Sequence, residues 1–347
     1  MALMRITSPH AHNKQSTSDV MKLVLLATLP GVLALTVAFG WGTVINILLA
    51  SIFGLALEAL ALAARKRPIA FYLKDYSALV TAVLLGIALP PYSAWWILLT
   101  GMFFSIIVAK QLYGGLGYNP FNPAMVGYVV LLISFPIQMT TWAAPIELLP
   151  ASVSVPNLWD SLLIALGFMQ LPTVDGFTMA TPLDLLRQNN ALMIDDLKQQ
   201  YSQFGQWGGT GWEWVSLGFL AGGLFLLYRK IFTWHAPISM LVALGLMSAL
   251  FYDGGSSASS GSPPFQLLTG AAIFGAFFIV TDPVSSAVSN KGRIIYGAGI
   301  GILIFLIRKW GNYPDAVAFA VLLMNFAAPL IDHYTQPTTY GHSKKSK

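Results

Sequence analysis

Hydrophobic residues occur along this chain in long uninterrupted blocks rather than in the alternating pattern of a half-exposed surface. Residues 77–109 and 111–146 contain no charged side chain. A run of about 20 apolar residues crosses a bilayer as a helix. Ten such segments are expected, at 20–39, 42–63, 77–89, 94–109, 124–139, 214–229, 236–252, 266–281, 293–308 and 313–331. The pattern therefore predicts an all-α polytopic membrane protein with about ten transmembrane helices.

The composition agrees with this prediction and excludes other classes. Of the 347 residues, 56% are hydrophobic and 10% are charged, whereas a soluble domain carries about 25% charged residues. An ordinary soluble enzyme of this size is therefore excluded. The chain has no cysteine, which excludes disulfides and cysteine-ligated iron–sulfur clusters. We interpret the net charge of +5 as a sign of membrane topology and expect no nucleic-acid partner.

The distribution of Lys and Arg predicts the orientation. With the N-terminus in the cytoplasm, 15 of the 19 basic residues fall on the cytoplasmic side. The other four are Arg187, Lys198, Arg308 and Lys309. Cytoplasmic loops of membrane proteins carry the excess of Lys and Arg, so both termini are expected in the cytoplasm. The first 19 residues are polar and lack the apolar core of a secretory signal peptide.

Five regions follow from these spans. We expect a cytoplasmic tail at 1–19, a first transmembrane repeat at 20–139, a periplasmic loop at 140–212, a second repeat at 213–332 and a basic cytoplasmic tail at 333–347. The loop follows five crossings, so it faces outward, and its charges are mostly acidic. Within it, residues 159–169 and 183–187 predict short helices that pack on the membrane surface. Tryptophans such as Trp212 and Trp214 are expected to form interfacial belts at span ends.

The two halves of the chain resemble each other. Residues 79–91 resemble 268–283, and residues 114–132 resemble 310–323. Each half contains five spans, an odd number, so the repeats are expected to be inverted, with a binding site near the midplane at their interface.

Prolines predict where the helices of the repeats break. Four breaks are expected, at Pro90-Pro91, Asn119-Pro120, Asn122-Pro123 and Asp282-Pro283. Broken backbone at membrane depth requires polar surroundings inside the protein. The alternative is that each break is an ordinary turn at the bilayer edge.

Glu58 is the acidic residue placed most clearly within a span. A buried acid in a span indicates function, but Glu58 lies about two turns before Arg65 and could instead reach the interface. Both interpretations stay open. The glycine-rich segment 114–117 follows no strand, so it is not a dinucleotide-binding motif. The five histidines are scattered near termini and interfaces, and no metal site is expected.

The most informative motif lies in the predicted outer loop. Asp175, Thr178, Ala180 and Thr181 have the spacing Asp-x-x-Thr-x-Ala-Thr. This spacing resembles the signature at which flavin transferases attach FMN to a threonine hydroxyl through a phosphoester. The last threonine, Thr181 here, accepts the flavin, while Asp175 and Thr178 occupy the other marked positions. The family usually has Gly where this chain has Met179.

The same residues also predict the start of a helix. Thr181 is a typical N-cap residue, Pro182 suits the first helical position and Asp184 suits the first turn. The two interpretations are compatible, because a phosphate on the N-cap oxygen would lie beside free backbone N–H groups and the positive helix end. Asp184 argues mildly against attachment, since it adds negative charge beside the phosphate.

Three further segments carry a wider resemblance. Residues 110–136, 275–283 and 321–325 resemble the D-subunit family of the Rnf (or Rsx) electron-transport complex. That family is similar to the B subunit of the sodium-pumping NADH:quinone oxidoreductase.

The resemblance implies a cofactor set, partners and a location. It implies a six-subunit assembly of the bacterial inner membrane that moves electrons between NADH and ferredoxin, coupled to sodium or proton movement. It implies covalent FMN on Thr181 and a second, non-covalent flavin such as riboflavin within the spans. It also implies a neighbouring subunit with its own threonine-linked FMN and a flavin transferase for maturation. Catalysis would occur only within the complex.

The predicted midplane site then has two uses. Asn119 and Asn122 could hydrogen-bond the edges of a second flavin ring, and Asp282 could offer a carboxylate to a cation. The alternative function is an inverted-repeat transporter or channel for ions or solutes without a redox cofactor. A membrane scaffold for other subunits is a third possibility. A covalently bound flavin distinguishes the electron-transport subunit from the transporter and from the scaffold.

Overall fold

The chain is described by a computed structural model that covers residues 16–171, 177–189, 191–257, 259–311, 313 and 316–336. This part of the chain is mostly helical. Its only strands are the two-residue β1 (Trp142–Ala143) and β2 (Thr178–Met179), which pair antiparallel. The prediction of a helical membrane fold is therefore confirmed at the level of its class.

The first half contains the helices up to residue 140. They are α1 (Thr17–Phe39), α2 (Gly42–Ala64), α3 (Ile69–Leu73), α4 (Ser77–Ala88), α5 (Trp95–Met102), the π-helix η1 (Phe103–Gln111), α6 (Pro123–Ser134) and α7 (Pro136–Thr140). The segment that follows contains the 3-10 helix η2 (Ile146–Leu148), α8 (Leu158–Leu166), α9 (Pro182–Gln188) and α10 (Ile194–Gln200).

The second half returns to longer apolar helices. They are α11 (Trp212–Tyr228), α12 (His235–Leu250), α13 (Pro263–Leu268), α14 (Ala272–Phe274), the π-helix η3 (Gly275–Ile279), α15 (Asn290–Trp310) and α16 (Val317–Thr335).

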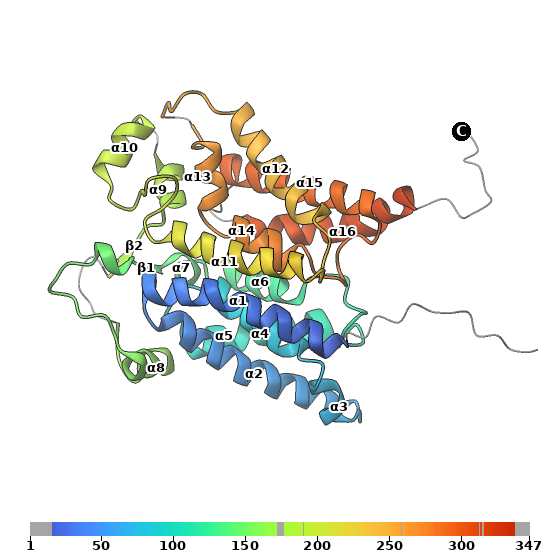
Figure 1. Cartoon of the computed structure of the whole chain (residues 1–347). Helices are drawn as coiled ribbons and strands as arrows, with labels where there is room; N and C mark the ends of the chain where they lie inside the picture. Colours follow the sequence, from blue (N-terminus) through green and yellow to red (C-terminus); the bar gives the residue numbers. More distant parts are fainter. Residues whose placement is uncertain are drawn as a thin grey trace, which may run out of the picture.

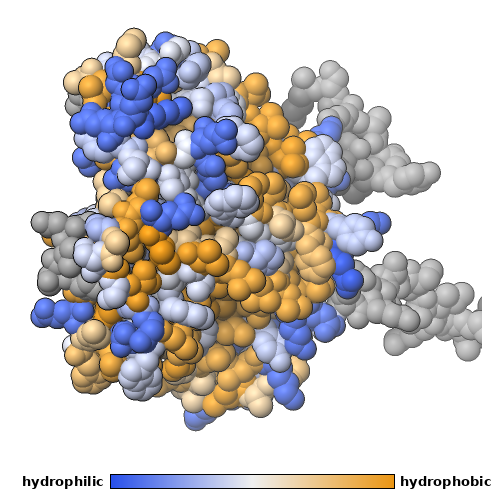
Figure 2. All heavy atoms as spheres, turned by 60° about the vertical axis from the view of Figure 1, so that its left-hand side comes forward, coloured by the Kyte–Doolittle hydropathy of each residue, from blue (hydrophilic) through white to orange (hydrophobic). Residues whose placement is uncertain are grey.

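Four of these helices, α1, α2, α15 and α16, are long and apolar enough to cross a membrane. Shorter apolar helices are α4, α5 with η1, α6, α11 and α12. Many large apolar side chains face outward, such as Val37 (77% exposed) and Phe326 (73%). Figure 2 shows this hydrophobic surface over the helical body, with hydrophilic residues gathered at the end that carries α9 and α10. Such a surface is stable only against lipid or protein.

Two predicted spans differ from the helices found. The segment 266–281 is not one helix but α13, α14 and η3, because the chain turns at Gly270, whose φ of +68° favours glycine. The segment 124–139 is interrupted after Ser134, because Pro136 lacks the N–H that would continue the ladder. The predicted short helices at 159–169 and 183–187 correspond to α8 and α9.

Small residues allow the helices to pack closely. α1 lies along α11, and a Cβ added at Gly222 would overlap the carbonyl oxygen of Ala27. α12 lies along α15, where a Cβ at Gly297 would overlap the carbonyl oxygen of Ala236. Close backbone approach through small residues is the usual way in which helices associate in membranes.

Different segments of the chain lie at the two ends of the helical bundle (Figure 1). The segment with α8, β1, β2, α9 and α10 lies at one end. The start of α1, the end of α16 and α3 lie at the other end. The bundle therefore separates the segment with the attachment motif from both described ends of the chain.

Candidate functional site

Thr181 is the N-cap of α9, as the helix-start interpretation predicts. Its backbone is extended (φ −68°, ψ 157°), and its hydroxyl accepts a hydrogen bond from the Asp184 N–H at 3.3 Å. The Asp184 carboxylate accepts from the Thr181 N–H at 3.2 Å and from the Thr181 hydroxyl at 2.6 Å. These reciprocal bonds form a capping box. The hydroxyl that the motif marks for attachment is thus held in place by a carboxylate.

The segment before Thr181 is fixed by a small strand pair. Thr178 pairs with Ala143 and Met179 with Trp142. Phe177 is 3% exposed, and its ring lies 5.7 Å from the ring of Tyr92. Thr178 itself is exposed. The predicted site residue Asp175 lies outside the described residues.

An apolar cluster anchors α9 to the second half of the chain. Leu183 and Leu186 of α9 pack with residues of α10 and with Phe204 and Phe265. Phe265 belongs to α13, and its ring lies 5.9 Å from that of Phe204. Burial of these side chains stabilises the position of the helix that carries Thr181.

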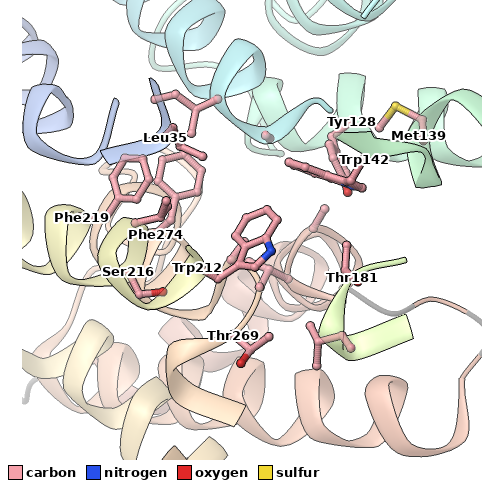
Figure 3. A pocket seen from close by; sticks show the side chains of 18 of the residues that line it. Leu35, Tyr128, Met139, Trp142, Thr181, Trp212, Ser216, Phe219, Thr269 and Phe274 are labelled. Carbon is pink, nitrogen blue, oxygen red and sulfur yellow. The ribbon is translucent and has the colours of Figure 1, made fainter. Parts of the chain in front are cut away.

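Thr181 lies beside a cavity with aromatic walls (Figure 3). Trp142 and Tyr128 approach it from one side and Trp212 from the other, with Thr181 next to the gap. The rings of Trp142 and Trp212 are 5.0 Å apart at an angle of 66°. Trp212, which we expected in an interfacial belt, is therefore a wall of this cavity. The cavity has a volume of about 100 Å³.

A second cavity of about 390 Å³ collects three of the other predicted site residues. Asn119, Asn122 and Asp282 all line it, together with Lys110 and Ser77. The breaks at Asn119-Pro120, Asn122-Pro123 and Asp282-Pro283 thus meet around one space.

Each of these polar residues is held by the protein. The Asn122 side chain caps α6 by accepting from the Met125 N–H at 3.3 Å. The Asn122 N–H donates to Asn325 at 3.2 Å. Asp282 accepts from the Ser285 hydroxyl at 2.7 Å. The side-chain oxygen of Asn119 is buried without a hydrogen-bond partner, so it is available to a ligand.

The other predicted breaks lie elsewhere. Pro90 does not line the second cavity. Its carbonyl oxygen accepts from the buried Asn46 amide at 2.8 Å and from the Ser93 hydroxyl at 2.7 Å, so this carbonyl is satisfied inside the protein. Of the matching segment in the second half, Asn312, Pro314 and Asp315 lie outside the described residues.

A thin wall separates the two cavities. On α6, Ala124 lines the second cavity while the next residue, Met125, lines the first. On η3, Phe278 lines the second cavity while Ile279 lines the first. Neighbouring residues of α6 and η3 therefore face different cavities. Thr181 lines the first cavity, and Thr17 at the start of α1 lines the second.

Comparison with known proteins identifies the family of the chain. The sequence model of the NQR2, RnfD, RnfE family matches residues 4–341. The chain belongs to this family. It is 60% identical over 347 residues to the D subunit of the ion-translocating oxidoreductase complex of Cellvibrio japonicus, covering 99% of this chain and 96% of that protein. It is 52% identical over 354 residues to the protein of the same name from Aliivibrio salmonicida, covering 99% and 100%.

This member of the NQR2, RnfD, RnfE family also has a buried ion pair that sequence reasoning found only in part. Glu58 is 3% exposed, so its carboxylate is enclosed by the protein. Its carboxylate accepts from Lys110 at 2.9 Å and from Gln111 at 2.8 Å. Lys110 also donates to the Ser77 hydroxyl at 2.8 Å. The signal was visible in the sequence, since Lys110 is the one charge between two long uncharged stretches.

Arg308, one of the four basic residues that the count left off the cytoplasmic side, is a second buried cation of this family member. Its guanidinium donates to the backbone and side-chain oxygens of Gln266 at 2.8 and 2.9 Å and to the Thr269 carbonyl at 3.3 Å. The orientation argument counted Lys110 on the cytoplasmic side and Arg308 on the other side, and both side chains are buried inside the protein. Each side of the count loses one residue, so the bias in Lys and Arg remains.

Proposed function

We propose that this protein is the flavin-carrying membrane subunit of an ion-translocating oxidoreductase complex of the Rnf type. In that role it relays electrons between NADH- and ferredoxin-linked partners, coupled to sodium or proton movement. Its relatives are named as subunits of an ion-translocating oxidoreductase complex. The observation that carries the proposal is the Thr181 hydroxyl, in the attachment motif, at the edge of a cavity walled by aromatic rings.

The residues around Thr181 fit FMN. The hydroxyl can form the phosphoester, and the faces of Trp142, Trp212 and Tyr128 suit a planar aromatic ring. Inside the complex, a neighbouring subunit would cover any part of the ring that this cavity leaves exposed.

A bound flavin supplies the acceptance and release of one or two electrons. The protein supplies the rest. Trp142 and Trp212 exclude water from the ring, and the β1–β2 pair fixes the segment that leads to Thr181. The cluster around Leu183 and Phe265 holds α9 against the second half of the chain.

We assign the second cavity to a non-covalent flavin such as riboflavin, or to the ion path. Its supporting features are the unpartnered oxygen of Asn119, the amide of Asn122 and the carboxylate of Asp282. The thin wall of α6 and η3 would let electrons pass between the two cavities over a short distance. π-helical turns such as η3 are frequent at functional sites.

The topology completes the proposal. Ten spans in two inverted repeats would place both termini in the cytoplasm and the segment 140–212 in the periplasm, within the bacterial inner membrane. The opposite positions of α9 and of the two described chain ends support placing them on opposite sides of the membrane, and the distribution of Lys and Arg supports the choice of the cytoplasmic side. The proposed partners are the other subunits of a six-subunit complex, one of which carries its own covalent FMN, and a flavin transferase for maturation.

Intact-mass measurement of the protein produced with its flavin transferase tests the main assignment. A mass increase equal to one FMN phosphoester, with fluorescence that persists in a denaturing gel, is expected. Thr181→Ala should abolish both signals, and Thr178→Ala should reduce them less. Retained fluorescence in Thr181→Ala would rule out Thr181 as the attachment site. A bare threonine in the complete complex would favour the transporter without a redox cofactor.

The second cavity and the topology need separate experiments. Asn122→Ala and Asp282→Ala should impair electron transfer or coupled ion movement while the mass increase at Thr181 remains. Ser202→Cys, in a chain without other cysteines, should react with an impermeant reagent added outside intact cells. Reaction only after the inner face is exposed would contradict the periplasmic assignment.

A further inference from the structure

A group of exposed side chains at the end of the bundle opposite α9 belongs to neither cavity. It lies on two segments, the turn with α3 and the glycine-rich loop at 112–118. Its apolar members are Ile69, Phe71, Leu112, Tyr113 and Tyr118. Its basic members are the exposed Arg65, Lys66 and Lys74 and the half-buried Arg67. We call these nine residues the α3–loop surface. Phe71, Leu112 and Tyr118 are each more than 70% exposed.

The two segments are joined by the arginines. Arg65 donates to the carbonyl and side-chain oxygens of Gln111 at 3.0 and 3.1 Å. Arg67 donates to the carbonyl of Gly114 at 3.0 Å, and its guanidinium lies 5.5 Å from the centre of the Tyr72 ring. These hydrogen bonds hold the two segments together, so the α3–loop surface is one surface rather than two independent loops.

The α3–loop surface begins where two apolar helices end, which would be the level of the lipid headgroups for helices that cross a membrane. α2, a helix long and apolar enough to cross a membrane, ends at Ala64, and Arg65 follows directly. The apolar helix formed by α5 and η1 ends at Gln111, and Leu112 follows directly. α3 has five residues, none of them buried. A short segment with exposed apolar and basic residues beside a span is typical of the membrane interface.

The charged residues of the α3–loop surface are all basic. The only ion pair in the described part of the chain joins Glu58 and Lys110, so no described carboxylate lies within 4 Å of the four basic groups. The nearest acid in sequence, Asp75, accepts from the N–H and hydroxyl of Ser77, both at 2.7 Å. Its charge is therefore turned towards the protein, and Lys66 and Lys74 remain exposed.

We propose that the α3–loop surface binds anionic phospholipid, with the phosphate at the basic residues and the acyl chains beside Phe71 and Leu112. An anionic lipid satisfies both halves of the surface at once, whereas an acidic protein would meet the charges and leave the apolar side chains to a separate contact. Leu116 of the same loop lines the second cavity. A lipid bound at this surface would therefore also stabilise the position of a loop that lines that cavity. The proposal does not depend on the flavin at Thr181.

A single-cysteine probe tests this placement in the full-length protein. Phe71→Cys carries a polarity-sensitive fluorophore, in discs whose phosphatidylcholine is brominated near the headgroup end of the chains. Quenching is expected, and it should increase when part of the lipid is replaced by brominated phosphatidylglycerol. The control is Trp207→Cys, at an exposed site near α9, which should not respond to the exchange of headgroups.

Substitution of the two lysines measures how much the basic residues contribute to lipid binding. Lys66→Gln and Lys74→Gln leave the bracing arginines intact. In detergent, each change should raise the phosphatidylglycerol concentration at half-saturation of the probe by about fivefold, since a basic residue near an anionic surface contributes about that factor. Binding of phosphatidylcholine should not change.

Three results would overturn the proposal. An unquenched probe in every disc would place the surface in water, where an acidic protein of the complex would be its partner. Equal quenching with both headgroups would reduce the contact to general membrane burial. An unchanged half-saturation in both lysine variants would remove the basic residues from the site.

Discussion

Attachment of FMN to Thr181 should break the cap of α9, and this prediction follows directly from one hydrogen bond. In the bare protein the Thr181 hydroxyl donates to the Asp184 carboxylate at 2.6 Å. A phosphoester replaces the hydroxyl hydrogen with a negatively charged phosphate. The carboxylate then loses a donor and faces a like charge, so it must turn away, and the cap of α9 must reorganise.

The cost can be estimated from the contacts that change. Loss of an N-cap interaction costs about 1 kcal/mol. Two like charges about 4 Å apart repel by about 1 kcal/mol in bulk water and by about 4 kcal/mol near a protein surface. Asp184 is half-buried, so the two effects together are about 2 to 5 kcal/mol. The first turn of α9 should therefore open more often once FMN is attached.

Hydrogen exchange measures this opening. Amides of α9 should exchange faster in the modified protein than in the bare protein. In Asp184→Asn, which keeps the shape and removes the charge, the difference should shrink, because an amide can donate to the phosphate. Asp195→Asn is the matched control, since Asp195 is an exposed acid on α10 that does not line the Thr181 cavity.

The outcome that refutes this reasoning is specific. If α9 exchanges equally before and after attachment, and Asp184→Asn behaves as the wild type does, the carboxylate does not oppose the phosphate. Mass spectrometry of the same samples shows whether FMN is attached. Failure of attachment is therefore distinguished from failure of the prediction.

Three further predictions concern the scaffold. Glu58→Gln leaves the Lys110 charge buried without its carboxylate, so it should destabilise the protein by about 3 kcal/mol, and Glu58→Gln with Lys110→Met should recover part of this loss in a thermal unfolding series. Gly222→Leu should separate α1 from α11, because even a Cβ overlaps the carbonyl of Ala27, and should abolish the folded peak in size-exclusion chromatography, whereas Leu224→Ala on the exposed face should not. Burial raises the pKa of Tyr92 from 10.0 to about 12. The neutral phenol therefore contributes to the free energy of unfolding; this contribution is complete below pH 10 and is lost as the pH rises to 12. Tyr92→Phe should remove this part of the pH dependence of stability.

The sequence by itself determined the helical membrane class, because uncharged runs long enough to cross a bilayer leave few other folds. It also determined the start of α9, since Thr181, Pro182 and Asp184 form a cap through bonds within four residues. The family resemblance rested on segments such as 110–136 and was confirmed by the match over residues 4–341. In each case the deciding interactions are local or depend on composition.

Tertiary structure decided what the separate motifs share. Asn122 and Asp282 are 160 positions apart in the chain, yet they line one cavity, because helix packing brings α6 beside η3. Burial of Lys110 depends on Glu58 from another helix, so a loop position was the natural sequence-based prediction. Trp212 faces Thr181 only after α11 has packed against α1. A hydropathy pattern specifies how much of a helix is apolar, but the partner of each polar side chain is set by the contacts between helices.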